Sequence, residues 1–153
     1  KVTTLWSVTH VLISLGSFGF FALSFVSGIL YLVEQQQLKG RPNAGLMDMM
    51  PSLQSLQNLI RWAIFAGVLL FTVGGVVGYL YARTLETQTN AWRTDPKILL
   101  TTATWAAYGL LLIASAIPFF RGRRTAWASI FCFCLLVLTA WSTVFWSPFH
   151  KFL

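Results

Sequence analysis

The stretch VTTLWSVTHVLISLGSFGFFALSFVSGILYLV, residues 2–33, contains no Asp, Glu, Lys or Arg. Three further stretches without charged residues follow, at 62–82, 98–120 and 125–150. An α-helix rises about 1.5 Å per residue and the hydrocarbon core of a bilayer is about 30 Å thick, so about 20 apolar residues span it. Each stretch reaches that length. The sequence therefore predicts an all-α polytopic membrane protein with four transmembrane helices in an up-down-up-down bundle.

We place the spans at 5–33, 62–82, 98–120 and 125–146, within a single membrane domain. Ahead of the second span, Pro51 and Ser52 form a plausible helix start. The apolar residues that follow recur at three-to-four spacing, which is typical of a helix lying on a membrane surface. We therefore expect a short amphipathic interfacial helix at about 51–60. Gly74 and Gly78 form a GxxxG pair, which predicts close helix packing but no chemistry.

The composition excludes several classes of protein. The chain is 56% hydrophobic and only 10% charged, whereas a soluble domain carries charge at about a quarter of its positions. The net charge of +7 comes from Lys and Arg in connections and at helix ends, where they meet lipid headgroups. We expect membrane lipids as partners and no nucleic acid.

Enzymatic activity is not expected. The four acidic residues all lie in connections between the spans: Glu34, Asp48, Glu86 and Asp95. They leave little acid–base machinery. The sequence also contains no Ser/His/Asp arrangement, phosphate-binding loop or metal-ligand spacing of a recognised kind.

Basic residues set the expected orientation. The side that contains the termini and the 83–97 loop has five: Lys1, Arg83, Arg93, Lys97 and Lys151. The other side has six: Lys39, Arg41, Arg61, Arg121, Arg123 and Arg124. The counts are nearly equal, but the dense 121–124 turn favours the cytoplasm for the second side. We expect a multi-pass protein of the inner membrane, with the 34–61 and 121–124 loops cytoplasmic and the 83–97 loop outside.

The two histidines are the candidate site. An even number of spans places His10 and His150 at the same membrane face, together with Trp92, Asp95 and most of the other tryptophans, including Trp6, Trp105, Trp141 and Trp146. A histidine near the membrane interior needs a partner and is a functional candidate by default. Two neutral imidazoles can hold a haem iron from both sides, with tryptophans along the porphyrin. Alternatively, His10 only hydrogen-bonds across the bundle and His150 lies free among the headgroups.

Several segments, in order, resemble the cytochrome c assembly family, whose branches include CcsA-, CcmC- and HemX-like haem-handling membrane proteins. They are His10-Val-Leu-Ile-Ser-Leu-Gly-Ser-Phe-Gly-Phe-Phe-Ala-Leu, Gly28-Ile-Leu-Tyr-Leu-Val-Glu-Gln, Pro51-Ser-Leu-Gln-Ser-Leu, Trp92-Arg-Thr-Asp-Pro-Lys and Pro148-Phe-His-Lys-Phe. The resemblance covers essentially the whole chain. Relatives usually have further spans before the first histidine, and this chain begins without Met, so we expect it to be part of a longer chain.

In that family a tryptophan-rich loop, the WWD motif, faces the periplasm between two histidines that ligate haem. The resemblance assigns the axial ligand roles for haem b to His10 and His150, and the loop role to residues 92–97. Trp105 and Trp141 would complete the wall of the site. The resemblance implies a role in handling haem for c-type cytochrome biogenesis, alongside other membrane proteins of cytochrome c assembly.

The loop departs from the family pattern. The positions that match are Trp92, Asp95, Pro96 and Lys97. Gln88 and Thr94 stand where tryptophans would be, and Ile98 replaces an acidic residue, so fewer aromatic faces are available to grip a porphyrin. This degenerate motif favours the HemX-like branch, which is linked to control of haem synthesis. Two alternatives therefore stand beside haem handling: a HemX-like regulator of tetrapyrrole synthesis that acts through its cytoplasmic loops, and a structural subunit of a larger membrane complex.

Overall fold

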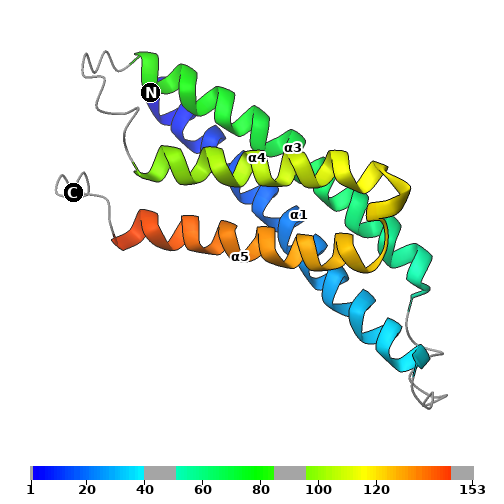
Figure 1. Ribbon diagram of the computed structural model, residues 1–153. Coiled ribbons are helices and arrows are strands. Elements are labelled where there is room, and N and C mark those ends of the chain that lie inside the picture. Colours follow the sequence, from blue (N-terminus) through cyan, green and yellow to red (C-terminus); the bar gives the residue numbers. More distant parts are fainter. Residues whose placement is uncertain (1, 40–50, 85–95, 146–153) are drawn as a thin grey trace.

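The computed structural model describes residues 2–39, 51–84 and 96–145, and almost all of these residues are helical. The elements are α1 (Val2–Lys39), α3 (Leu53–Thr84), α4 (Pro96–Ala116), the short 3₁₀ helix η2 (Pro118–Phe120) and α5 (Arg123–Phe145) (Figure 1). All four α-helices are long and apolar enough to cross a membrane. The prediction of an all-α polytopic membrane protein is confirmed.

The four helices form two antiparallel pairs. α1 packs along α3, α4 packs along α5, and α5 also contacts α1 (Figure 1). The start of α1 therefore lies at the same end of the bundle as the end of α3, the start of α4 and the end of α5. We call this the histidine end, because His10 is there. The opposite end, which contains Arg61 and the 121–124 turn, is the arginine end.

The two pairs differ in length. α1 has 38 residues and α3 has 32, which correspond to about 57 and 48 Å of helix. α4 and α5 have 21 and 23 residues, or about 32 and 35 Å, close to the thickness of a bilayer core. α1 and α3 thus extend beyond the length that a single crossing needs, and the extra turns lie largely at the arginine end (Figure 1).

The predicted interfacial helix at 51–60 does not form a separate surface element. Residues 53–60 are the first turns of α3, which continues without a break to Thr84. The predicted start is confirmed, because the Ser55 backbone N–H donates to Ser52 Oγ at 3.3 Å as in an N-cap. Leu56 and Ile60 are each only 1% exposed. This part of the apolar stripe therefore packs against the bundle.

The apolar core lies in the middle of the bundle and toward the arginine end. Its buried members are Phe21, Tyr31, Leu56, Ile60, Ile64, Tyr108, Leu111, Ala126 and Leu136. At its centre the Phe21 and Tyr108 rings stack with centroids 3.7 Å apart. A methyl group added at Gly67 would lie 2.6 Å from Phe21, so α3 needs a glycine where this ring crosses it.

Small and hydroxylated residues line the contact between α1 and α5. Ser129 Oγ of α5 donates to the Ser24 carbonyl of α1 at 3.3 Å. A methyl group at Gly28 would lie 2.8 Å from Ser129 Oγ and 3.1 Å from the Ala126 carbonyl oxygen. Helices in lipid associate through such close backbone approach.

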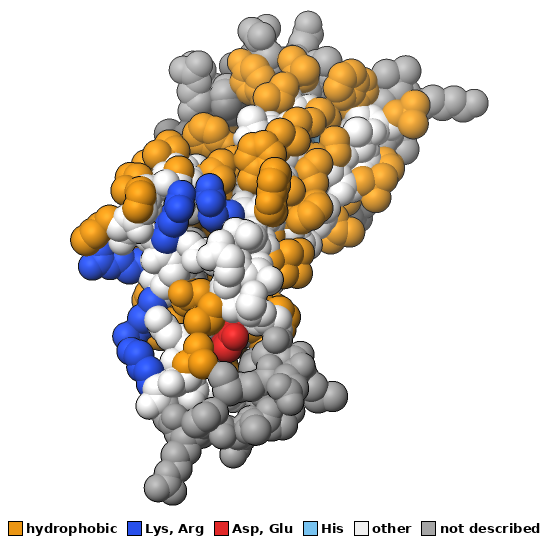
Figure 2. Space-filling view, turned by 90° about the vertical axis from the view of Figure 1, so that its right-hand side faces the viewer, with side chains coloured by type: hydrophobic (Ala, Val, Ile, Leu, Met, Phe, Trp, Pro, Cys, Tyr) orange, Lys and Arg blue, Asp and Glu red, His pale blue; other side chains and the backbone are white. Residues whose placement is uncertain are grey.

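Large apolar side chains cover much of the outer surface, as expected where lipid replaces water (Figure 2). Lys and Arg side chains gather in one region of the face that Figure 2 shows. The turn between α4 and α5 contributes to this region. It contains Gly122 at φ 82°, a left-handed conformation that favours glycine. The Arg124 guanidinium lies over the Phe119 ring, 3.8 Å from its centroid.

Candidate functional site

His10 is the predicted haem ligand that lies within the described residues. It lies eight residues into α1, or about 12 Å along the helix from Val2. From residue 5 to residue 12, every residue of α1 except His10 is exposed; His10 is half-buried. Its imidazole faces α3, so α1 contacts the second half of α3 at this point.

A hydrogen bond fixes the imidazole to the backbone of α3. Nδ1 of His10 lies 2.8 Å from the carbonyl oxygen of Gly74. A carbonyl oxygen only accepts hydrogen bonds, so Nδ1 must carry the proton and donate. In a neutral imidazole, Nε2 then keeps its lone pair. The described residues provide no hydrogen-bond partner for Nε2.

Gly78 forms the second part of this contact. A methyl group added at Gly78 would lie 2.9 Å from Cε1 and 3.0 Å from Nδ1 of His10. Carbon atoms do not approach that closely without a clash, so the ring occupies the space that any other side chain at this position would fill. The GxxxG pair, which the sequence indicated only as a packing motif, is the surface on which His10 lies.

Sequence reasoning missed this role of Gly74 and Gly78, although a signal for it was present. His10 lies eight residues from the start of α1, and Gly78 lies six residues before the end of α3. In an antiparallel hairpin these positions fall at similar depth. A comparison of these positions would have placed the histidine and the glycines at the same level of the bundle. It would not have shown that they face each other, because the rotation of a helix about its axis does not follow from position along it.

The tryptophans of the predicted wall lie on exposed surfaces. Trp105 is 45% exposed and Trp141 is 64% exposed. The indole N–H of Trp105 donates to Thr72 Oγ1 on α3 at 2.9 Å. Positions 72 and 74 point about 200° apart around a helix, so Trp105 contacts a different face of α3 from the one that holds His10. A wall formed by both tryptophans stays a prediction.

The remaining predicted site residues, His150, Trp92 and Asp95, lie outside the described residues. Their neighbours in the chain are placed at the histidine end: α4 begins at Pro96 and α5 ends at Phe145. His150 follows Phe145 by five residues.

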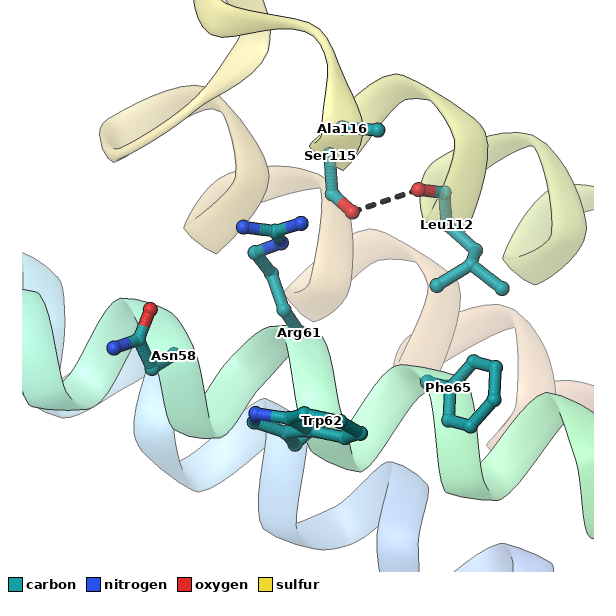
Figure 3. Close-up of a pocket in the computed structure, with 7 residues that line it drawn as sticks. All are labelled: Asn58, Arg61, Trp62, Phe65, Leu112, Ser115 and Ala116. Atoms are coloured by element: carbon teal, nitrogen blue, oxygen red, sulfur yellow. Dashed lines mark hydrogen bonds between the residues drawn. The ribbon is translucent and has the colours of Figure 1, made fainter.

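The arginine end contains two lipid-side grooves. One of about 420 Å³ lies between α3 and α4, lined in part by Arg61, Trp62 and Ser115 (Figure 3). The other, of about 470 Å³, lies between α1 and α5, beside Lys39 and Arg123. Arg61 precedes Gly78 by 17 residues, or about 26 Å of helix. Lys39 follows His10 by 29 residues on α1, or about 44 Å of helix. Neither groove is therefore part of the histidine site.

Further groups that could take part in chemistry are Glu34 and the two cysteines. Among the residues that the structure describes, no group of three or more His, Cys, Asp or Glu could hold a metal ion. Glu34 is nine-tenths buried, and its Oε2 has no hydrogen-bond partner in the part of the chain that the structure describes. It lies 24 residues beyond His10 on α1, about 36 Å away along the helix. Cys132 and Cys134 are both free thiols.

The fold and the site together define a class: a multi-pass α-helical membrane protein in which a histidine near the start of the first span is hydrogen-bonded to a neighbouring helix. A family model described as "Cytochrome C assembly protein" matches residues 2–150. The chain therefore belongs to the cytochrome c assembly protein family. The resemblance predicted from the sequence is confirmed, and the family implies the handling of haem.

Two curated relatives carry the name "Protein HemX". The protein from Brevibacillus brevis is 30% identical over 105 residues, which cover 69% of this chain and 38% of the relative. The protein from Bacillus subtilis (strain 168) is 25% identical over 145 residues, covering 95% of this chain and 52% of the relative. The chain thus spans about half the length, or less, of these relatives. No solved structure matches it.

Proposed function

We propose that this chain binds haem b at the histidine end and handles it for c-type cytochrome biogenesis. His10 and His150 would hold the haem iron, and Trp92, Asp95, Trp105 and Trp141 would contribute to the wall. The observation that carries the proposal is the hydrogen bond from His10 Nδ1 to the Gly74 carbonyl. This hydrogen bond leaves the lone pair of Nε2 available to coordinate haem iron.

The chemistry of the donor set fits haem. A neutral histidine whose second nitrogen donates to a backbone carbonyl is the usual arrangement of a metal-binding imidazole. Iron supplies affinity and redox chemistry when haem is bound, and the chain supplies orientation, an apolar surrounding and exclusion of water. His150 lies five residues beyond Phe145, and five residues reach at most about 18 Å. A second ligand at the same end is therefore compatible with the chain.

The proposed orientation places the histidine end outside the cytoplasm, in the inner membrane. The support is the basic 121–124 turn at the opposite end, because positively charged loops stay in the cytoplasm.

Cysteine labelling in this turn tests the orientation. Gly122→Cys is unsuitable as a probe, because Gly122 has a positive φ. A cysteine in place of the exposed Arg121, in a background without Cys132 and Cys134, should react with impermeant reagents only in inverted vesicles. Reaction in intact cells would show the opposite orientation, with the histidine end in the cytoplasm.

Absorption spectroscopy of the detergent-purified protein tests haem binding. The wild type should show a Soret band, and both His10→Ala and His150→Ala should reduce it. Arg123→Gln at the arginine end is the matched control and should leave the band unchanged. A band that survives unaltered in both histidine variants rules out this ligand pair. A complete absence of haem, together with stoichiometric recovery in a larger complex, would favour the structural subunit.

The two matches to proteins named HemX favour a second candidate, a regulator that contacts an enzyme of tetrapyrrole synthesis through the 34–61 and 121–124 segments. Arg61 and Arg123 present charge there and make no ion pair within the described part of the chain. Replacing both with Gln should then reduce the amount of co-purified partner without changing any haem spectrum. Unchanged recovery of partners would count against a regulator of this kind.

A further inference from the structure

We propose that Gly74 and Gly78 are positioning residues for His10. Together they fix the imidazole against α3 in the tautomer with the proton on Nδ1, so that Nε2 keeps its lone pair before any ligand arrives. We call this contact of His10 with Gly74 and Gly78 the glycine seat. Its importance for haem rests on the proposed function, whereas the seat itself is a property of the protein without haem.

The first component of the seat is steric. Position 78 has no side chain, and the Nδ1–Cε1 edge of the imidazole lies where a β-carbon would be, at 3.0 and 2.9 Å. The atoms in conflict belong to a ring that is itself hydrogen-bonded on the same side. The ring cannot move away from a new methyl group and keep the 2.8 Å contact between Nδ1 and the Gly74 oxygen.

The second component is electronic. The Gly74 carbonyl lies within α3 and already accepts the helical N–H four residues later. A carbonyl oxygen has two lone pairs, so it can also accept from the histidine. A hydrogen bond to Nδ1–H fixes the tautomer and the ring orientation. Side-chain volume at position 74 matters less, because a methyl group there would lie 3.3 Å from Ile13 Cγ2 and 3.4 Å from Ser14 Oγ.

The chain offers a closely matched control. Gly75 is the next residue of α3, and a methyl group added there would have no neighbour within 4 Å. Gly75→Ala and Gly78→Ala both replace a glycine in the same helix and gain the same helix propensity. Any difference between the two variants therefore reports the contact with His10.

The direct test is ¹⁵N NMR of the histidine side chains in the haem-free protein, with the His10 signals identified by their loss in His10→Gln. The wild type should show neutral His10 in the Nδ1–H form. Gly78→Ala should shift the population toward the Nε2–H form, while Gly75→Ala should match the wild type. A wild-type His10 in the Nε2–H form, or a tautomer that Gly78→Ala leaves unchanged, overturns the seat. The wild-type measurement decides even if Gly78→Ala fails to fold.

Haem titration of the same variants gives the second readout. Disrupting a hydrogen bond to a metal-binding histidine costs about 10- to 100-fold in affinity. Gly78→Ala should therefore weaken haem binding at least tenfold, and Gly75→Ala by less than twofold. Equal affinities in all three proteins contradict the link between the seat and haem. If no protein binds haem but the tautomers behave as expected, the seat stands and the proposed function fails.

Discussion

The two ends of the bundle are held together in different ways. At the arginine end, apolar and small residues pack tightly: Leu56 and Ile60 are buried against the bundle, and Gly28 admits no added methyl group. Toward the histidine end, helices are joined by single polar contacts, such as the one from His10 to Gly74. From residue 5 to residue 16, α1 has no fully buried residue. One end is a closed core, and the other leaves Nε2 of His10 without a hydrogen-bond partner among the described residues.

This difference separates stability from function within a single set of helices. A closed apolar core tolerates little change of volume, whereas an imidazole in a membrane needs a defined partner. We expect changes at the arginine end to alter the free energy of unfolding, and changes around His10 to alter haem affinity with less effect on stability. The predictions below test this contrast, in order of decreasing effect.

The largest effect on stability should come from added volume where α1 meets α5. Gly28→Leu places its first carbon 2.8 Å from Ser129 Oγ and 3.1 Å from the Ala126 carbonyl oxygen, and the backbone there cannot move aside. We expect a loss of about 3 kcal/mol or more in the free energy of unfolding, at the upper end for overpacked cores. Chemical denaturation in detergent measures it.

Gly19→Leu is the matched control for this variant. It lies on the same helix, its position is exposed, and a methyl group there would have no neighbour within 4 Å. Its stability should equal or exceed that of the wild type. Equal losses in the two variants would mean that the contact between α1 and α5 is not the closed core described above.

A smaller effect is expected from the polar contact between α4 and α5. Thr104 is fully buried and its hydroxyl lies 2.9 Å from Thr139 Oγ1. Thr104→Val keeps the shape and removes this hydrogen bond, which should cost about 1 kcal/mol in the free energy of unfolding, typical of hydrogen bonds between membrane helices. Thermal unfolding compares it with Thr102→Val, whose exposed hydroxyl bonds only its own helix at Ile98. If the two variants lose the same stability, the contact between the helices contributes nothing.

The smallest effect should come from the basic turn. Arg124 lies over the Phe119 ring, and an exposed cation–π contact is worth about 0.5 kcal/mol. Arg124→Gln should lower the free energy of unfolding by that amount. Arg123→Gln should not lower it, because the structure gives Arg123 no contact of this kind. A larger loss for Arg123 than for Arg124 would show that the contact over Phe119 does not stabilise the turn.

The sequence predicted the four spans, the helix start at Ser52, and the family. These features follow from hydrophobic length, capping residues and recognisable segments, which are local. It did not predict that the helix at 51–60 continues into the second span. An apolar stripe of this kind suits both a membrane surface and a helical bundle, and the burial of Leu56 and Ile60 shows that part of it packs against the bundle. The contact between His10 and the GxxxG pair was not predicted either, because helix rotation depends on tertiary packing.

The hydrogen bond across the bundle that the alternative interpretation gave to His10 is present, at Gly74. It does not oppose the haem hypothesis, since it occupies Nδ1 and leaves Nε2. The two interpretations therefore differ in what Nε2 does, which the placement of His10 alone does not decide.

The most direct measurement is a haem titration of the purified wild-type chain, followed by low-temperature electron paramagnetic resonance. Our account predicts one haem per chain, with the low-spin signal of iron held by two imidazoles, and loss of that signal when either His10 or His150 becomes Ala. A wild-type protein that leaves added haem in its free, high-spin form would contradict the account.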